Sequence, residues 1–268
     1  MTDSAYTNQR VASVYSRIAA PLQFQLPARD LVGILGPMEG ARVLDVGTGT
    51  GAVALPAKAA AGSAGLVVGV DAAIEMLRFA REAANYPLAV AQMPELPFGD
   101  RVFDVVMAGF VVSHLPDYSR GLAEMVRVCR SGGKVGITSW AAGPNPAAQL
   151  WTRIAGEYVP PDRLDNAFRA HIPWDDWFAH PANITGALHA SGLMSVAVDT
   201  REYRFTMTTS EYVQSREASV QGLVLREACA PQRWNEFTHQ VAGVFRERFG
   251  GTVEYRREVH FGIGTRPR

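Results

Sequence analysis

The sequence predicts an α/β fold in which helices cover both faces of a mainly parallel, doubly wound sheet of seven strands. Short apolar runs alternate with longer segments whose apolar residues recur at helical spacing. The runs contain few polar residues, as expected of parallel strands that are buried on both faces. Of the 268 residues, 47% are hydrophobic and 19% are charged, so the chain can bury a sizeable core.

The first forty residues are predicted to be helical, because Val11, Val14 and Ile18 recur at helical spacing and Gly36-Pro37 ends the pattern. The strands expected next are 42–46, 66–70, 88–91, 103–108 and 134–139, and the helices between them are 53–61, 74–84 and 118–130. Ser131-Gly132-Gly133 is a helix-ending signal after the last of these. This alternation is typical of βαβ units, so the core is predicted to be Rossmann-like.

The second half of the chain is less regular. Its expected elements are a helix over 144–159, a loop-like segment over 160–181, a helix over 182–190, a strand over 195–205, helices over 210–228 and 231–249, and a strand over 252–264. We therefore divide the chain into an N-terminal helical cap (1–40), a core (41–141), an insertion (142–180) and a segment (181–268) that completes the sheet and carries a helical lid at about 208–249.

The charge balance excludes some partners. Lys plus Arg and Asp plus Glu number 26 each, which argues against a general binder of nucleic acid or anionic membranes. Only two of the basic residues are lysines, and this arginine bias fits either recognition of carboxylate or phosphate or a G+C-rich coding sequence. Cys129 and Cys229 lack metal-type spacing, the N-terminus lacks a signal-peptide pattern, and no apolar run approaches the ~20 residues of a membrane span. We expect a soluble cytoplasmic protein without a metal.

A glycine-rich turn, Gly47-Thr48-Gly49-Thr50-Gly51, follows the first strand, at the edge where open parallel sheets bind ligands. Its glycines let backbone approach a ligand closely, and the next helix offers free N–H groups. Asp71 ends the second strand twenty residues later, where a carboxylate can accept hydrogen bonds from both hydroxyls of a ribose. The pattern predicts a cofactor that contains a nucleoside.

The same turn satisfies the dinucleotide pattern G-x-G-x-x-A through Ala52, so an NAD-dependent oxidoreductase stays open. Two features favour another cofactor. A third glycine at Gly51 gives G-x-G-x-G, and Asp45 lies two positions before the turn. A carboxylate there repels a pyrophosphate and attracts a ligand that carries an ammonium and a sulfonium.

Motifs over about residues 41–140 resemble, in order and spacing, those of class I S-adenosylmethionine-dependent methyltransferases. The matching segments are Val43–Gly51, Val68–Leu77, Ala91–Phe98, Phe103–Val106, Leu115–Asp117 and Arg127–Lys134. The resemblance is strongest to the small-molecule group that includes quinone and sterol C-methyltransferases and natural-product methyltransferases. It implies S-adenosylmethionine as cofactor and S-adenosylhomocysteine as product.

By this resemblance, Asp45 and the Gly47 backbone hold the methionine ammonium and Asp71 binds the ribose. The full set of cofactor-binding residues that it implies is Tyr15, Asp45, Gly47, Thr48, Gly49, Gly51, Asp71, Ala72, Met76, Gln92, Met93, Ala108, Gly109 and Phe110. Gln92 and Met93 depart from the family pattern of Asp followed by a small residue. A Gln carbonyl can still accept from the adenine amino group, and Met93 can pack on the ring.

Methyl transfer is an in-line displacement that needs a base only if the acceptor must lose a proton. His114 is the candidate base, or else a structural residue that precedes Leu115-Pro116-Asp117. The other five histidines show no ligand spacing, and we expect packing or surface roles for them.

Two groups of residues in the second half suggest acceptor contacts. Trp140, Trp151, Trp174 and Trp177 could form a pocket for a flat or apolar acceptor, or pack the lid or a dimer interface. Another four, Arg201, Arg204, Arg226 and Arg233, could meet an acidic acceptor or lie on solvated helix faces.

The leading hypothesis is an S-adenosylmethionine-dependent methyltransferase that acts on oxygen, carbon or nitrogen of a small molecule. The alternatives are a non-catalytic S-adenosylmethionine-binding protein and the NAD-dependent oxidoreductase. A nucleic-acid acceptor is disfavoured by the zero net charge and by Ala108-Gly109-Phe110-Val111, which stands where amino-group methyltransferases of nucleic acids carry an Asn-Pro-Pro-Tyr type of tetrapeptide. No motif identifies the acceptor or the oligomeric state, and an oligomer is compatible with the sequence.

Overall fold

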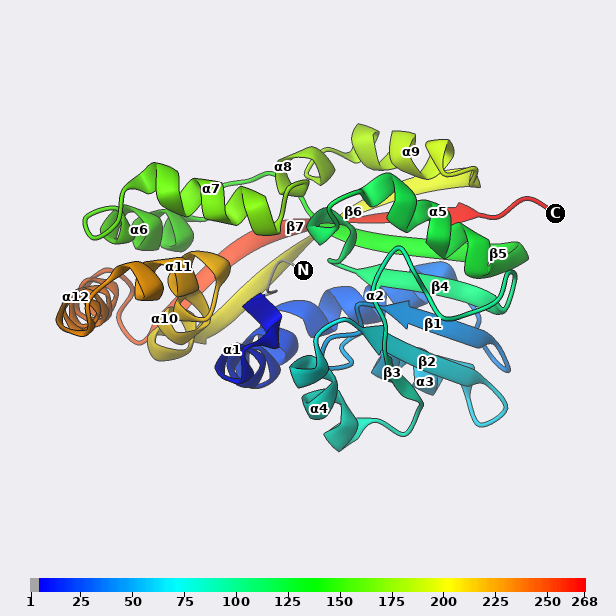
Figure 1. Ribbon diagram of the computed structural model, residues 1–268, viewed down its shortest axis with the longest axis horizontal. Helices are drawn as coiled ribbons and strands as arrows, with labels where there is room; N and C mark the ends of the chain where they lie inside the picture. The colour runs from blue at the N-terminus through cyan, green and yellow to red at the C-terminus, as the bar shows by residue number, and fades with distance from the viewer. Residues whose placement is uncertain (1–4) are drawn as a thin grey trace.

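The computed structural model describes residues 5–268, and within this range one sheet of seven strands has the order β3-β2-β1-β4-β5-β7-β6 (Figure 1). The strands are β1 (Arg42–Val46), β2 (Leu66–Asp71), β3 (Leu88–Val90), β4 (Phe103–Gly109), β5 (Cys129–Trp140), β6 (Met194–Thr208) and β7 (Thr252–Thr265). All neighbours are parallel except β7, which is antiparallel to β5 and β6. The predicted fold class is confirmed. The strand order reverses between β1 and β4, and such a switch point is where ligands bind in open α/β sheets.

Helices account for most of the remaining chain. Those before the sheet are η1 (Ala5–Thr7), α1 (Gln9–Val14), η2 (Tyr15–Phe24) and α2 (Gln25–Leu35). Those within the core are α3 (Ala54–Ala61), α4 (Ile74–Ala83), η3 (Val112–His114) and α5 (Tyr118–Val128). The later ones are α6 (Pro146–Ala155), α7 (Pro161–His171), α8 (Asp175–Phe178), α9 (Pro181–Ala190), α10 (Thr209–Glu217), α11 (Val220–Ala228) and α12 (Pro231–Phe249). None of the helices in the described range is long and apolar enough to cross a bilayer.

The core strands are covered on both faces because successive side chains point to opposite sides of a strand. Val43 on β1 and Val105 on β4 belong to the apolar cluster that contains α2 and α3. Their neighbours Leu44 and Val106 belong to the cluster of α5 and α9 on the other face. These four residues are at most 6% exposed, which explains why the strands show no polar alternation in the sequence.

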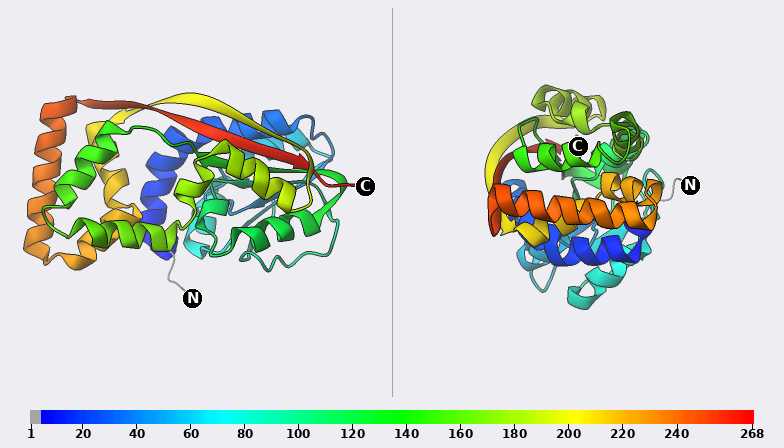
Figure 2. Two further views of the ribbon diagram at one scale, coloured as in Figure 1. Left: turned by 90° about the horizontal axis from the view of Figure 1, so that it is seen from above. Right: turned by 90° about the vertical axis from the view of Figure 1, so that its left-hand side faces the viewer.

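The last two strands extend the molecule well beyond the core. β6 and β7 pair continuously from Ala197 opposite Ile263 to Thr208 opposite Thr252. Their far ends carry α10, α11 and α12, and the N-terminal helices lie between this lid and the core (Figures 1 and 2). η2 contacts both α10 and β6, while α1 contacts α4 in the core. η2 is a π-helix with Pro21 inside it, a geometry that is often found at functional sites.

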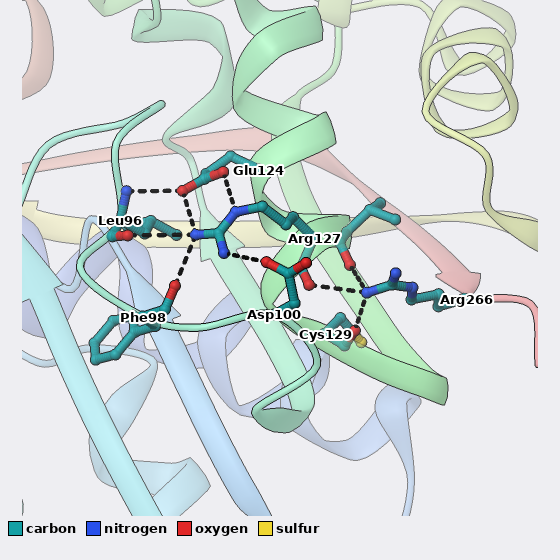
Figure 3. Close-up of polar contacts among 8 residues, drawn as sticks. Leu96, Phe98, Asp100, Glu124, Arg127, Cys129 and Arg266 are labelled. Carbon is teal, nitrogen blue, oxygen red and sulfur yellow. Dashed lines mark hydrogen bonds and ion pairs between the residues drawn. The ribbon is translucent and has the colours of Figure 1, made fainter.

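The predicted helix over 118–130 is two residues too long. α5 ends at Val128, and β5 begins at Cys129 and runs through Ser131-Gly132-Gly133. The C-terminal segment explains this difference. The Arg266 guanidinium donates hydrogen bonds to three backbone carbonyls at the end of α5, and the Arg266 backbone pairs with that of Gly132 and Gly133 (Figure 3).

The prediction of a loop over 160–181 is wrong, because α7 and α8 lie there. Pro161 and Pro181 stand in the first turns of α7 and α9, where the missing N–H has no helical partner to lose. α7 buries Leu164 and half-buries Ala167 and Phe168, so its apolar face is short. The helix predicted after β6 is also two helices, α10 and α11, because Ser219 caps α11 by accepting from its first turn.

Candidate active site

The turn between β1 and α3 has a conformation that only glycine adopts easily. Gly47, Gly49 and Gly51 have φ angles of 66°, 56° and 92°. Space is limiting as well, because a Cβ at Gly47 would overlap the Val111 side chain and one at Gly51 would lie 2.5 Å from Tyr86 Oη. A side chain at Gly47 or Gly51 would therefore require Val111 or Tyr86 to move.

Asp71, at the end of β2, fixes the turn. Its Oδ2 accepts a hydrogen bond of 2.8 Å from the Gly49 N–H, and its Oδ1 accepts one of 2.8 Å from the Ala73 N–H. Burial raises the pKa of Asp71, and these backbone hydrogen bonds oppose the rise. Each carboxylate oxygen keeps a lone pair for a further donor. Asp71 thus joins the glycine turn to the start of α4 and can still accept from a ligand.

Asp45, on β1, is a buried carboxylate without a hydrogen-bond partner. It is 1% exposed, and neither of its oxygens accepts a hydrogen bond from the described residues. Burial raises the pKa of Asp45 to about 7, although the nearby Thr48 hydroxyl and Ala54 N–H lower it. Two hydroxyls close by, those of Thr48 and Tyr86, are equally buried and unpaired. Unpaired buried polar groups are costly, so this cluster fits a ligand or a solvent molecule that supplies a donor.

Five of the predicted cofactor residues line one small cavity of about 20 Å³ at the turn: Tyr15, Gly47, Thr48, Gly109 and Phe110. It is also lined by Phe24, which the sequence analysis did not single out. The Phe24 ring is stacked on Tyr15 with 5.3 Å between centroids and lies edge-on to Phe110 at 5.0 Å.

The other predicted residues surround this cavity at varying distance. Met76 on α4 lies next to Gly49, with its Cε 3.6 Å from where a Gly49 Cβ would be. Ala72 is exposed beside Asp71, and Gln92 is exposed in the loop after β3. Met93 is 7% exposed with its Cε close to α5, and Ala108 is fully buried in β4. The structure thus brings Met76 to the turn and places Met93 and Ala108 in the core.

The loop after β3 is fastened to α5 by an arginine network (Figure 3). Arg127 donates to the carbonyl oxygens of Leu96 and Phe98, at 3.3 and 2.8 Å. It also pairs with Glu124 at 2.7 Å and Asp100 at 2.6 Å. Glu124 in turn accepts from the Leu96 N–H. These bonds fix the loop that carries Gln92, and the sequence analysis did not assign Arg127 this role.

His114 does not line the cavity at the glycine turn. Its ring is 5.9 Å from that of Tyr6. Burial and, to a lesser extent, the charge of His171 together lower the pKa of His114 to about 4. The imidazole is therefore neutral at pH 7 and a weak base, far from the pKa near the working pH that suits a general base.

A second cavity of about 180 Å³ lies between the N-terminal helices and the lid. Tyr15 and Phe24 line it as well, so their stacked rings separate it from the cavity at the glycine turn. On the lid side it is lined by Tyr212 and Arg216 of α10 and by Arg257 of β7. The two cavities together give a site at the switch point of the sheet that is closed on one side by the lid.

Comparison with known proteins identifies the family. Residues 44–137 match the family model described as a methyltransferase domain. The nocamycin O-methyltransferase of Saccharothrix syringae is 33% identical over 207 residues, which cover 70% of this chain and 71% of that protein. This chain belongs to the S-adenosylmethionine-dependent methyltransferases.

Further relatives agree with this. Aklanonic acid methyltransferase DauC of Streptomyces sp. (strain C5) is 34% identical to this methyltransferase over 190 residues, covering 66% of the chain and 82% of the relative. The solved YcgJ protein of Bacillus subtilis has the same fold, with a TM-score of 0.55 at 16% identity over 91% of this chain and 99% of that one. The predicted function, a small-molecule methyltransferase, is confirmed, and the comparisons favour neither alternative.

The tryptophans of the methyltransferase do not form one pocket. Trp151 is fully buried against Phe237, with 5.5 Å between ring centroids. Trp174 and Trp177 pack around Tyr118, away from both cavities. The Trp140 ring contacts Phe110, which lines the cavity at the glycine turn, at 4.6 Å between centroids.

The arginines at the second cavity are not those that the sequence suggested. Arg201 forms ion pairs on the surface with both Asp30 and Asp199, and Arg204 forms one with Glu254. Arg226 and Arg233 lie over the rings of Trp234 and Tyr158, and none of these four lines the cavity. Arg216 and Arg257 do, and no spacing in the sequence distinguishes them from other arginines. Among residues 5–268, no group of three His, Cys, Asp or Glu side chains is placed to hold a metal ion.

Proposed function

We propose that this methyltransferase binds S-adenosylmethionine at the glycine turn and methylates a small molecule held in the 180 Å³ cavity. The observation that carries the proposal is the combination of the Gly47–Gly51 turn with Asp71, whose oxygens have lone pairs to spare, and Asp45, whose oxygens have no partner. In this proposal Asp71 accepts from the ribose hydroxyls and Asp45 faces the methionine ammonium. Met76 and Ala72 flank the adenine, and Gln92 meets its edge.

S-adenosylmethionine, when bound, supplies an electrophilic methyl carbon on a positively charged sulfur. The chain's own part is mainly positioning and exclusion of water, which together lower a barrier by several kcal/mol or more. Gly47 and Gly109 keep the turn and the end of β4 free of side chains, while Tyr15 and Phe24 cover the small cavity from the acceptor side. Because the pKa of His114 is about 4, we propose that the acceptor needs little help from a protein base.

The size of the second cavity supports a small acceptor. Its volume of about 180 Å³ is below the ~300–1,000 Å³ of typical ligand pockets, so a larger acceptor requires the N-terminal helices to shift. The relatives named for nocamycin and aklanonic acid are likewise small-molecule methyltransferases. An aromatic or apolar body fits the Tyr15 and Phe24 side of the cavity.

The test is calorimetric titration with S-adenosylhomocysteine, with NADH as the competing ligand. We expect the wild type to bind S-adenosylhomocysteine with a micromolar-range Kd and not to bind NADH. Asp71→Asn should weaken binding roughly 10–100-fold, because a charge-assisted hydrogen-bond acceptor is lost. Asp104→Asn is the matched control, since Asp104 also accepts from a backbone N–H but at the opposite end of the sheet, from Arg42. Absence of binding, or equal loss in both variants, contradicts the proposal.

A further inference from the structure

The second cavity is lined by two guanidinium groups and, among the described residues, by no carboxylate. Resting on the proposed function, we infer that the methyl acceptor is an organic acid whose anionic group is bound by Arg216 and Arg257. An arginine fork matches a carboxylate geometrically and electrostatically. No pattern in the sequence singles out these two arginines, which lie on a lid helix and on the last strand.

Arg216 on α10 is charged, half-buried and incompletely bonded. Its guanidinium lies 4.8 Å from the centroid of the Trp151 ring and donates one hydrogen bond of 2.6 Å to Gln221 Oε1. Its Nε is buried without a hydrogen-bond partner, and the side chain forms no ion pair with the described residues. Buried arginines are nearly always paired, so a guanidinium in this state is suited to a partner from outside the chain.

Arg257 on β7 lines the same cavity, with its guanidinium over the face of Trp140 at 4.1 Å from the ring centroid. The described residues give it no ion pair and no hydrogen bond, and Asp175, outside the cavity lining, is the carboxylate whose charge acts on it. The Trp140 ring contacts Phe110, which lines the cavity at the glycine turn. Arg257 is therefore separated from the cofactor side by two aromatic rings.

The second cavity also has a neutral hydrogen-bond donor beside the two arginines. Tyr212 is 2% exposed, lines the same cavity, and its hydroxyl has no hydrogen-bond partner. Glu217 follows Arg216 in the chain but pairs with Arg10 at 3.6 Å and does not line the cavity. The lid wall thus presents two positive charges and a free hydroxyl, while Tyr15 and Phe24 present aromatic surface on the other side.

The competing explanation is that these arginines only hold the lid by stacking on aromatic rings. The chain offers a matched control, because Arg226 and Arg233 also stack on rings, each at 5.3 Å, but outside the cavity. A stacking role predicts that Arg216→Gln lowers thermal stability as Arg226→Gln does. A ligand role predicts unchanged or higher stability for Arg216→Gln, because an unpaired buried charge is removed.

The experiment titrates benzoate, 1-naphthoate and 4-hydroxycinnamate, each beside its neutral carboxamide, into the protein by calorimetry. The acids should bind at least roughly 10-fold more tightly than the amides. Arg216→Gln and Arg257→Gln should each weaken acid binding roughly 10–100-fold and leave amide binding unchanged. Arg226→Gln and Arg233→Gln should bind both as the wild type does.

The inference is overturned if amides bind as well as acids, if no acid binds with a Kd below about 1 mM, or if the control variants lose as much affinity. Every variant is titrated with S-adenosylhomocysteine first, and the acid titrations are made with and without it. Loss of S-adenosylhomocysteine binding refutes the proposed function, whereas intact binding without acid preference refutes this inference alone.

Discussion

The buried carboxylate of Asp45 should give the ligand-free protein a characteristic response to pH. Its pKa is about 7 in the folded state and ~3.9 in an unfolded chain. Between these values the folded protein holds a proton that the unfolded chain has lost. The stability that protonated Asp45 contributes is therefore complete below about pH 4 and is lost as the pH rises through about 7.

The magnitude follows from the two pKa values. A pKa raised by about three units costs about 4 kcal/mol of unfolding free energy once Asp45 is ionised, at about 1.4 kcal/mol per pH unit. Of this, about 3 kcal/mol falls between pH 5 and pH 8. Asp45→Asn removes the titration but adds an unpaired amide, whose cost of about 1–3 kcal/mol does not vary with pH. From pH 5 to pH 8, the unfolding free energy of the variant should therefore rise by about 3 kcal/mol relative to that of the wild type.

The assay is urea unfolding of both proteins at pH 5, 6, 7 and 8, followed by tryptophan fluorescence. The raised pKa of Asp71 is common to both proteins and cancels in the comparison to first order. A ligand ammonium beside Asp45 should lower its pKa, so S-adenosylhomocysteine should release about half a proton at pH 7. This release appears in calorimetry as a dependence on the ionisation enthalpy of the buffer. A difference in unfolding free energy that stays constant from pH 5 to 8 would show that Asp45 is ionised in the folded protein, and would refute the reasoning.

Two substitutions test the surroundings of the turn. Gly47→Ala should destabilise the protein by roughly 1–3 kcal/mol in thermal unfolding, because of the positive φ angle and the overlap with Val111. Adding Val111→Ala to this variant should restore part of the lost stability, because it removes the overlap. If the second substitution restores none, the φ angle is the dominant cause of the loss. Arg127→Gln should weaken S-adenosylhomocysteine binding roughly 3–10-fold and speed hydrogen exchange in the loop after β3, since its charge-assisted bonds hold that loop. Arg120→Gln, on the exposed face of the same helix, is the control, and unchanged exchange in the Arg127 variant would contradict this role.

The constellation of Asp45, the glycine turn and Asp71 could be predicted because it depends on local order. Each side chain follows or ends a strand that is recognisable by its apolar run, and parallel strands bring their carboxyl ends to one edge. In the structure β1 pairs with β2 from Arg42 opposite Leu66 onwards, so adjacency along the chain becomes adjacency in space. The spacing of apolar residues and the glycines that end several elements are therefore sufficient to predict this part of the fold.

The acceptor side could not be predicted in the same way. Arg216 and Arg257 are 41 residues apart on a helix and a strand, and only the fold places them on one cavity. The orientation of Met93 depends on packing against α5, and α7, which buries Leu164, packs against the lid helix α11. Such features result from tertiary contacts, which override local patterns.

The two cavities are built from different parts of the chain, and this division has a consequence for specificity. The family model matches residues 44–137, and no residue that lines the second cavity falls in this range. That cavity is formed by the N-terminal helices, by Asn145 and by the lid carried on β6 and β7. Under the proposed function, substitutions there change the groups that meet an acceptor and leave Asp45, Asp71 and the glycine turn in place. Relatives with the same cofactor motifs can therefore act on different acceptors, and the residues to compare first are those equivalent to Arg216 and Arg257 rather than those of the shared core.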